Sequence, residues 1–146
     1  MRVRLLPPNA QDEFFLIRVE VFKLVVDDID LAERNSQNIE DAYHEHWLSS
    51  CSDGSYLFRA PEFYLTQGKA RFINGRHRML VLSRHLAQIP MALANMDGYP
   101  VRATQPTSIS ERVLSKLAVR RTTKEEVFLF PDLPIRYLGY DVNIGK

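Results

Sequence analysis

The sequence has almost no cysteine, because Cys51 is the only one among 146 residues. A single thiol cannot form an intramolecular disulfide, and this pattern is typical of proteins in a reducing compartment. We therefore expect a cytoplasmic location. Cys51 lies in a loop-like run of serine and aspartate, with no neighbouring histidine or lysine to activate its thiol. We expect this cysteine to be dispensable rather than nucleophilic.

Long hydrophobic runs are also absent. No window approaches the length of a membrane-spanning helix, and residues 1–8 lack the apolar core of a signal peptide. Repeats, low-complexity segments and linkers are missing too. A chain of 146 residues has the size of one domain, so we predict a single domain over residues 1–146.

The chain carries little net charge, with a formal value of +1 at pH 7. That value gives no support for general electrostatic binding to nucleic acid. The distribution is uneven, however, because residues 63–96 contain no acidic residue. Such segregation focuses anionic ligands onto one face if folding keeps the basic residues together. The basic residues of this segment are Lys69, Arg71, Arg76, Arg78 and Arg84.

Residues 62–95 form the segment around which the predicted fold is organised. Residues 67–69 suit a hairpin turn, because glycine can take a positive φ. After Gly75 the hydrophobic period changes from two to 3.6, which places Met79 and Leu82 on one helical stripe. The pattern therefore predicts a hairpin, a turn, a helix and a returning strand in this order, with strands at 62–66, 70–73 and 91–94.

Polar and cationic side chains gather where this helix begins, in Asn74-Gly75-Arg76-His77-Arg78. The first turn of a helix leaves backbone N–H groups unpaired, and the macrodipole favours anions there. Glycine lets an anion approach the backbone, arginine donates forked hydrogen bonds to phosphate, and histidine titrates near neutral pH. One hypothesis for this turn is phosphate binding. The other is a solvated basic turn that merely caps the hairpin.

The same residues resemble the signature of the ParB/sulfiredoxin superfamily. Residues 73–78 read Ile-Asn-Gly-Arg-His-Arg, and an apolar helix and Ile89-Pro90-Met91 follow. In that superfamily a strand ends in a Gly-x-[His/Arg]-Arg turn, the helix N-terminus holds nucleotide phosphates, and an Ile-Pro-x strand comes next. The resemblance is clear over residues 62–95. It implies an α+β fold, namely a ParB/sulfiredoxin-like single domain with a mixed sheet and about three helices.

Two departures narrow the resemblance. Arg76 stands where a sulfiredoxin has its reactive cysteine, which argues against sulfinic acid reduction. The chain also has no room for the helix-turn-helix and dimerisation domains of a chromosome-partitioning ParB. It is most similar to the plasmid fertility-inhibition proteins of the Osa type.

That resemblance implies a factor that suppresses conjugative or T-DNA-type transfer. It would bind and hydrolyse ATP or another nucleoside triphosphate and cleave DNA with Mg²⁺. Asn74 and Gly75 would bind the nucleotide together with the next three residues. Arg76 and Arg78 would hold phosphates, and His77 would act as an acid–base catalyst or stabilise the transition state. These three are therefore the expected catalytic residues.

The favoured hypothesis is that the protein is an enzyme, an ATPase or a DNase, and two alternatives stay open. One is a nucleotide-binding switch that does not cleave its ligand. The other is an interaction protein that blocks a partner in the conjugation or secretion machinery.

Three basic residues flank the turn, and we expect them to contact DNA. Because no recognition helix is evident, these contacts should be to backbone phosphates, tolerant of sequence and sensitive to salt. The three residues are Lys69, Arg71 and Arg84.

A second basic stripe is predicted on a helix that begins at a Ser108–Glu111 capping box and runs to about Arg121. Its residues are spaced four apart, which places them on one helical face. A solvated face is the default explanation, and a phosphate-tracking surface is the sharper one. The stripe consists of Arg112, Lys116 and Arg120.

The rest of the chain yields simpler predictions. Arg2–Leu6 suits an edge strand, and residues 13–26 alternate as one long strand or two. Ser36 suits a helix cap, with the helix ending near Ser49. Strands at 127–130 and 135–142 are expected to close the sheet.

Within the helix after Ser36, His44 and His46 are two residues apart and point to different faces, so a zinc pair is disfavoured. Asp41 and Glu45 share a face and suit Mg²⁺. Beyond that spacing, the sequence assigns no metal ligands.

Overall fold

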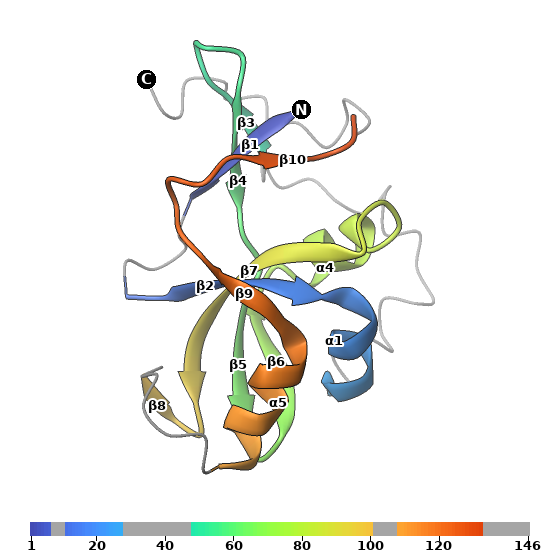
Figure 1. Cartoon of the computed structure of the whole chain (residues 1–146), viewed down its shortest axis with the longest axis vertical. Helices are drawn as coiled ribbons and strands as arrows, with labels where there is room; N and C mark the ends of the chain where they lie inside the picture. The colour runs from blue at the N-terminus through green and yellow to red at the C-terminus, as the bar shows by residue number, and fades with distance from the viewer. Residues whose placement is uncertain (7–10, 28–47, 101–107, 133–146) are drawn as a thin grey trace.

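The computed structural model describes residues 1–6, 11–27, 48–100 and 108–132. In that part the chain is α+β, with two mixed sheets and three helices. Figure 1 shows the smaller sheet at one end of the molecule and the larger sheet at the other. The α+β class is as predicted, and two of the three described helices, α4 and α5, were expected, whereas α1 lies where a strand was predicted. The described strands form two sheets instead of the single expected sheet. The helices are α1 (Val19–Val25), α4 (Arg76–Leu82) and α5 (Ile109–Leu117).

The smaller sheet has the strand order β10-β1-β4-β3. Its strand β1 pairs parallel with β4 and antiparallel with β10. The prediction that this strand lies at an edge is therefore wrong, because a two-residue strand from late in the chain covers it. The strands are β1 (Arg2–Leu6), β3 (Leu48–Ser50), β4 (Tyr56–Arg59) and β10 (Phe128–Leu129).

The larger sheet has the order β6-β5-β7-β2-β9, with β8 paired to β7. Strands β5 and β7 run parallel, and the other neighbours are antiparallel. The parallel pair is possible because α4 carries the chain back between β6 and β7. The strands are β2 (Glu13–Arg18), β5 (Glu62–Thr66), β6 (Lys69–Asn74), β7 (Gln88–Met96), β8 (Tyr99–Pro100) and β9 (Ala118–Thr122).

One hydrophobic core joins the two sheets. Strand β4 runs into β5 through Ala60 and Pro61, so a single extended stretch contributes to both (Figure 1). On the larger sheet, Phe22 of α1 packs edge-on against Phe63 and Phe72, with ring centroids 5.3 and 5.4 Å apart. These contacts fix α1 over β5 and β6.

The central hairpin is confirmed. Strands β5 and β6 pair antiparallel around Gln67 and Gly68, both of which have positive φ angles of 51° and 79°. This is the backbone that a tight two-residue hairpin turn requires. The strand expected at 91–94 is also present and is longer, as β7.

The prediction of strand over residues 13–26 is half wrong. Strand β2 ends at Arg18, and α1 follows at once. Alternating valines favour a strand, but the buried residues of this stretch, Val19 and Phe22, are spaced as on a helix. The contacts of Phe22 with the sheet outweigh the local β propensity.

The predicted end of the helix after Ser108 is also wrong. The Ser108 hydroxyl accepts a hydrogen bond from the Glu111 N–H, as a capping box requires, but α5 ends at Leu117. The next residues form β9, which pairs with β2. Arg18 of β2 donates to two carbonyl oxygens at this helix end, those of Lys116 and Ala118.

Other differences concern strands of the smaller sheet. Leu48 and Ser49, expected at the end of a helix, belong to β3, and β4 was not predicted. The strand at 127–130 is present in shorter form as β10. The remainder of the helix after Ser36 and the strand at 135–142 lie outside the described residues.

Candidate functional site

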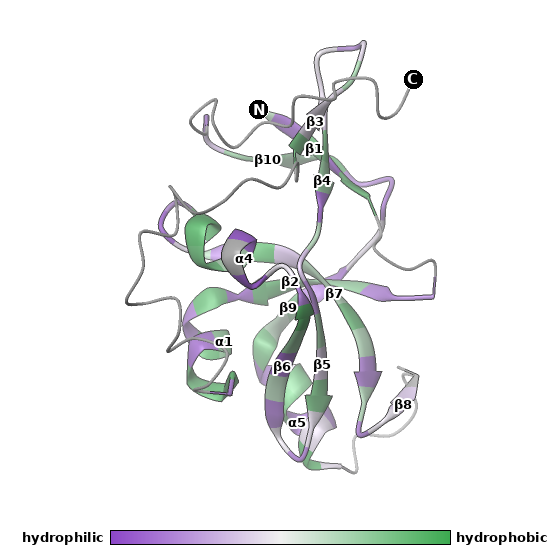
Figure 2. Cartoon of the chain, turned by 180° about the vertical axis from the view of Figure 1, so that it is seen from behind, coloured by the Kyte–Doolittle hydropathy of each residue, from purple (hydrophilic) through white to green (hydrophobic). Residues whose placement is uncertain are grey.

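The predicted site lies where β6 passes into α4. Asn74 is the last residue of β6, Gly75 is the N-cap, and α4 begins at Arg76. Gly75 has φ 87° and ψ 15°, in the left-handed region that favours glycine. The predicted start of the helix is therefore confirmed. Figure 2 shows α4 passing from hydrophilic residues at its start to hydrophobic residues further along.

Gly75 is packed closely on one side. A β-carbon added there would lie 2.6 Å from Pro61 Cα and 2.5 Å from the Nη2 atom of Arg78. Pro61 is itself held in place, because its carbonyl oxygen accepts a hydrogen bond of 2.8 Å from the Ala92 N–H. The glycine is thus needed for close packing as well as for its φ angle.

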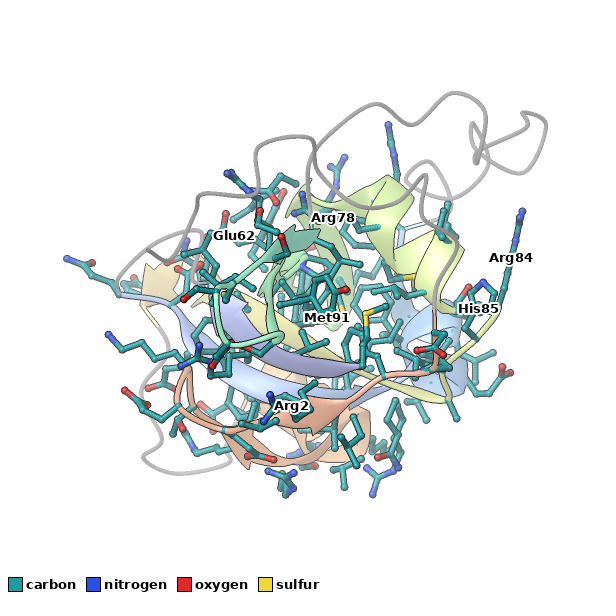
Figure 3. The ribbon with its side chains drawn as sticks, turned by 90° about the horizontal axis from the view of Figure 1, so that it is seen from above. Arg2, Glu62, Arg78, Arg84, His85 and Met91 are labelled. Atoms are coloured by element: carbon teal, nitrogen blue, oxygen red, sulfur yellow. The ribbon has the colours of Figure 1, made fainter. Side chains whose placement is uncertain are left out.

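Arg78 points into the protein rather than into solvent (Figure 3). Only 4% of the residue is exposed. Its guanidinium donates to the Asn74 side-chain oxygen at 2.5 Å and to the Ala60 carbonyl oxygen at 3.4 Å. These contacts tie the first turn of α4 to β6 and to the link between β4 and β5. Arg78 therefore supports the junction from inside.

Glu62, at the start of β5, completes a polar cluster in which Glu62 and Arg78 are buried and Asn74 is exposed. It is 6% exposed and accepts a hydrogen bond from Asn74 Nδ2 at 3.2 Å. Burial, followed by the hydrogen bond and charge of Asp12, raises the pKa of Glu62 to about 7, against a smaller lowering by Arg78. We call these four residues, Asp12, Glu62, Asn74 and Arg78, the junction cluster.

Sequence patterns gave no indication that Asp12 and Glu62 lie at this junction. Glu62 reads as one polar position of an alternating strand, and Asp12 stands 50 positions earlier in the chain. The residues meet because β5 and β2 both pair with β7. Only the sheet order shows this proximity.

The other predicted binding residues surround the junction unevenly. Arg76 is partly exposed at the first position of α4, and the backbone of His77 follows it in the helix. Lys69 is exposed at the far end of β6, about 16 Å from Asn74 at the usual rise per strand residue. Arg84 is exposed just beyond the end of α4 and projects outward (Figure 3). Arg71 lies within β6 and is half-buried. Their expected roles in nucleotide and DNA binding stay predictions.

The second basic stripe does not exist as predicted. Arg120 belongs to β9, so it cannot continue a helical row with Arg112 and Lys116. Its guanidinium instead forms a bidentate ion pair with the Glu126 carboxylate. This pairing raises the pKa of Arg120 and, together with a hydrogen bond from Thr122, lowers that of Glu126.

A cavity of about 420 Å³ lies beside the junction cluster rather than at the predicted turn. Asp12 lines it, together with Arg121, Lys124 and Glu125 from β9 and the following turn. None of residues 74–78 contributes to its wall. The Arg121 guanidinium is already engaged, since it pairs with Glu13 and lies 4.9 Å from the centroid of the Phe15 ring.

Metal ligation receives no geometric support from the part of the chain that the structure describes, which contains no group of three side chains able to hold an ion. Asp41 and Glu45, the carboxylates that suit Mg²⁺, and His44 and His46 lie outside the described residues. Among the described residues, no helix is both long enough and apolar enough to cross a bilayer.

No known family model matches the chain, and neither a curated protein nor a solved structure matches it. The likeness to the ParB/sulfiredoxin superfamily accordingly stays a prediction from residues 62–95.

Proposed function

We propose that this protein binds a nucleoside triphosphate, such as ATP, at the junction of β6 and α4. In this proposal the protein is a plasmid fertility-inhibition factor that acts through this site. The sequence resemblance over residues 62–95 supports the proposal. So does the order of the elements, since a strand, a glycine turn, a helix and a returning strand with Ile89-Pro90-Met91 follow one another.

The observation that carries the proposal is the combination at Arg76. This partly exposed arginine begins α4 directly after a left-handed glycine, in a segment of 34 residues, 63–96, without an acidic side chain. Arginine donates paired hydrogen bonds that suit a phosphate group, although the carboxyl groups of Glu62 and Asp12 also lie at this junction. Because Arg78 is buried within the junction and Arg76 is partly exposed, we assign ligand contact to Arg76.

Within this proposal, Arg76 and His77 act on the phosphates, and Asn74 and Arg78 hold the turn in shape. Arginine stabilises the charge that develops during phosphoryl transfer or phosphodiester cleavage, and histidine moves a proton. Mg²⁺ would neutralise phosphate charge when bound. Lys69, Arg71 and Arg84 remain the proposed contacts to the DNA backbone, which suits their positions along β6 and just beyond the end of α4.

The test combines purified protein with ATP and with plasmid DNA, in Mg²⁺ or in EDTA. We expect phosphate release or nicked DNA with Mg²⁺ only, and a loss of at least about tenfold in Arg76→Ala because a charge-assisted contact disappears. Lys23→Ala is the matched control, since it removes an exposed positive charge from α1. Absence of product from wild-type protein that binds nucleotide would favour the switch instead.

The biological part of the proposal is tested by mating. Donor cells that express the protein should transfer a plasmid less often, and Arg76→Ala should restore transfer while Lys23→Ala should not. Inhibition that survives in Arg76→Ala would favour the alternative in which the protein blocks a partner through another surface.

A further inference from the structure

Among the described residues, the junction cluster combines two carboxyl groups, those of Asp12 and Glu62, with one guanidinium, that of Arg78. Glu62 is 6% exposed, and the Oδ2 atom of Asp12 is buried with no hydrogen-bond donor within the described part of the chain. The Asp12 side chain interacts with the Glu62 carboxyl and contributes to raising its pKa. Two ionised carboxylates offer acceptors only, so a hydrogen bond between them requires a proton on one.

Within residues 1–6, 11–27, 48–100 and 108–132, the other groups around Glu62 provide little further compensation. From α4, Arg78 supplies one positive charge, and from β6, Asn74 supplies a neutral amide. On β7 the residue opposite Glu62 is the apolar Ala92. Four further charged residues line the cavity beside Asp12, namely Glu13, Arg121, Lys124 and Glu125. Of these, Glu13 and Arg121 form an ion pair with each other.

Charge balance in the cluster then depends on one proton. With the proton present, one carboxylate and the Arg78 guanidinium cancel. Without it, two carboxylates face one guanidinium at a buried site, and burying an uncompensated charge is costly.

We propose that Asp12 and Glu62 share one proton that latches the start of β2 onto the junction of β5, β6 and α4, and that losing this proton loosens the junction. On deprotonation the proton passes to solvent, and the hydrogen bond between the two carboxyl groups is replaced by repulsion. Asn74 and Arg78, which hold the turn at Gly75, then lose part of their support. The latch does not require that the junction bind a nucleotide.

The expected pH dependence follows from the pKa of Glu62, which burial and Asp12 raise from 4.5 to about 7. The folded protein therefore binds more protons than the unfolded chain between these values. Stability from this group is fully present below pH 4.5 and is lost as the pH rises through 7. The unfolding equilibrium constant should rise by up to about tenfold per pH unit in this window, and by roughly 10²-fold in total.

The direct test is a titration of the wild-type side-chain carboxyl groups by ¹³C nuclear magnetic resonance. We expect the Glu62 carboxyl to titrate with a midpoint near 7, and the backbone amides of Asp12 and Gly75 to report the same midpoint. A Glu62 midpoint below about 5.5, close to that of ordinary carboxyl groups, would overturn the proposal.

A second measurement compares variants by urea unfolding between pH 5 and 8. Glu62→Gln keeps a side-chain donor for Asp12 without a titrating proton, so its stability should lack the pH dependence of wild type. Glu20→Gln, a control at an exposed position of α1, should keep that dependence. Equal pH dependence in wild type and Glu62→Gln would contradict the latch.

Discussion

Replacement of Gly75 by alanine should destabilise the protein by on the order of 3–5 kcal/mol. Alanine adopts a φ of 87° only with strain, and its β-carbon would lie 2.6 Å from the backbone of Pro61. Pro61 cannot withdraw easily, because its carbonyl oxygen is bonded to the Ala92 N–H. Urea unfolding of wild type and variant measures the difference in the free energy of unfolding.

The matched control is Gly98→Ala. Gly98 has nearly the same φ, 82°, but an added β-carbon there would meet nothing within 4 Å. Its cost should be limited to the strain of the left-handed conformation, roughly 1–2 kcal/mol. Equal losses in the two variants would show that the packing of Gly75 against Pro61 and Arg78 contributes nothing.

Arg78→Ala should cost about 3–5 kcal/mol, because it removes a buried cation that faces the buried Glu62 carboxyl and donates to the buried Ala60 carbonyl oxygen. The Asn74 oxygen and the Ala60 carbonyl oxygen lose this donor, and Glu62 loses the one cation that faces it among the described residues. Thermal and urea unfolding at pH 7 should both report the loss.

Arg84→Ala is the control for this variant. Arg84 is exposed beyond the end of α4, so its replacement should change stability by less than about 0.5 kcal/mol. If Arg78→Ala were as stable as Arg84→Ala, Arg78 would not support the junction. A loss of ligand binding in Arg78→Ala reports on both folding and contact, which makes Arg76 the better position for a functional test.

The local structure of the central segment could be predicted from sequence. A hairpin at Gln67 and Gly68 and a helix that starts after Gly75 depend on turn chemistry and on the change of hydrophobic period, both of which are local signals. The helix α1 could not be predicted in this way. Its valines favour a strand, and only the contacts of Phe22 across the sheet make the helix preferable.

The backbone arrangement of residues 74–78 was predicted in outline, but the burial of their side chains was not. Sequence placed Asn74, Gly75 and the two arginines at one turn, which the structure bears out. It gave no means of telling that Arg78 would be buried while Arg76 stays partly exposed, since both fall in the first turn of the helix. Helical position alone does not determine which side the rest of the protein covers.

The carboxyl pair shows the same limit over a longer distance. Asp12 and Glu62 belong to segments that have no local relation, and they meet through β7, which pairs with both β2 and β5. Strand order is a global property of the sheet. A polar residue at the start of a strand therefore reveals little until its neighbours across the sheet are known.

The most direct measurement is a calorimetric titration of ATP into wild type and Arg76→Ala, with Lys23→Ala as the control and Mg²⁺ present. We expect saturable binding by wild type and Lys23→Ala. Affinity for Arg76→Ala should be weaker by about 1.5–3 kcal/mol, the scale of one lost charge-assisted contact. Absence of binding by wild type, or unchanged affinity in folded Arg76→Ala, would contradict a nucleotide site at this junction.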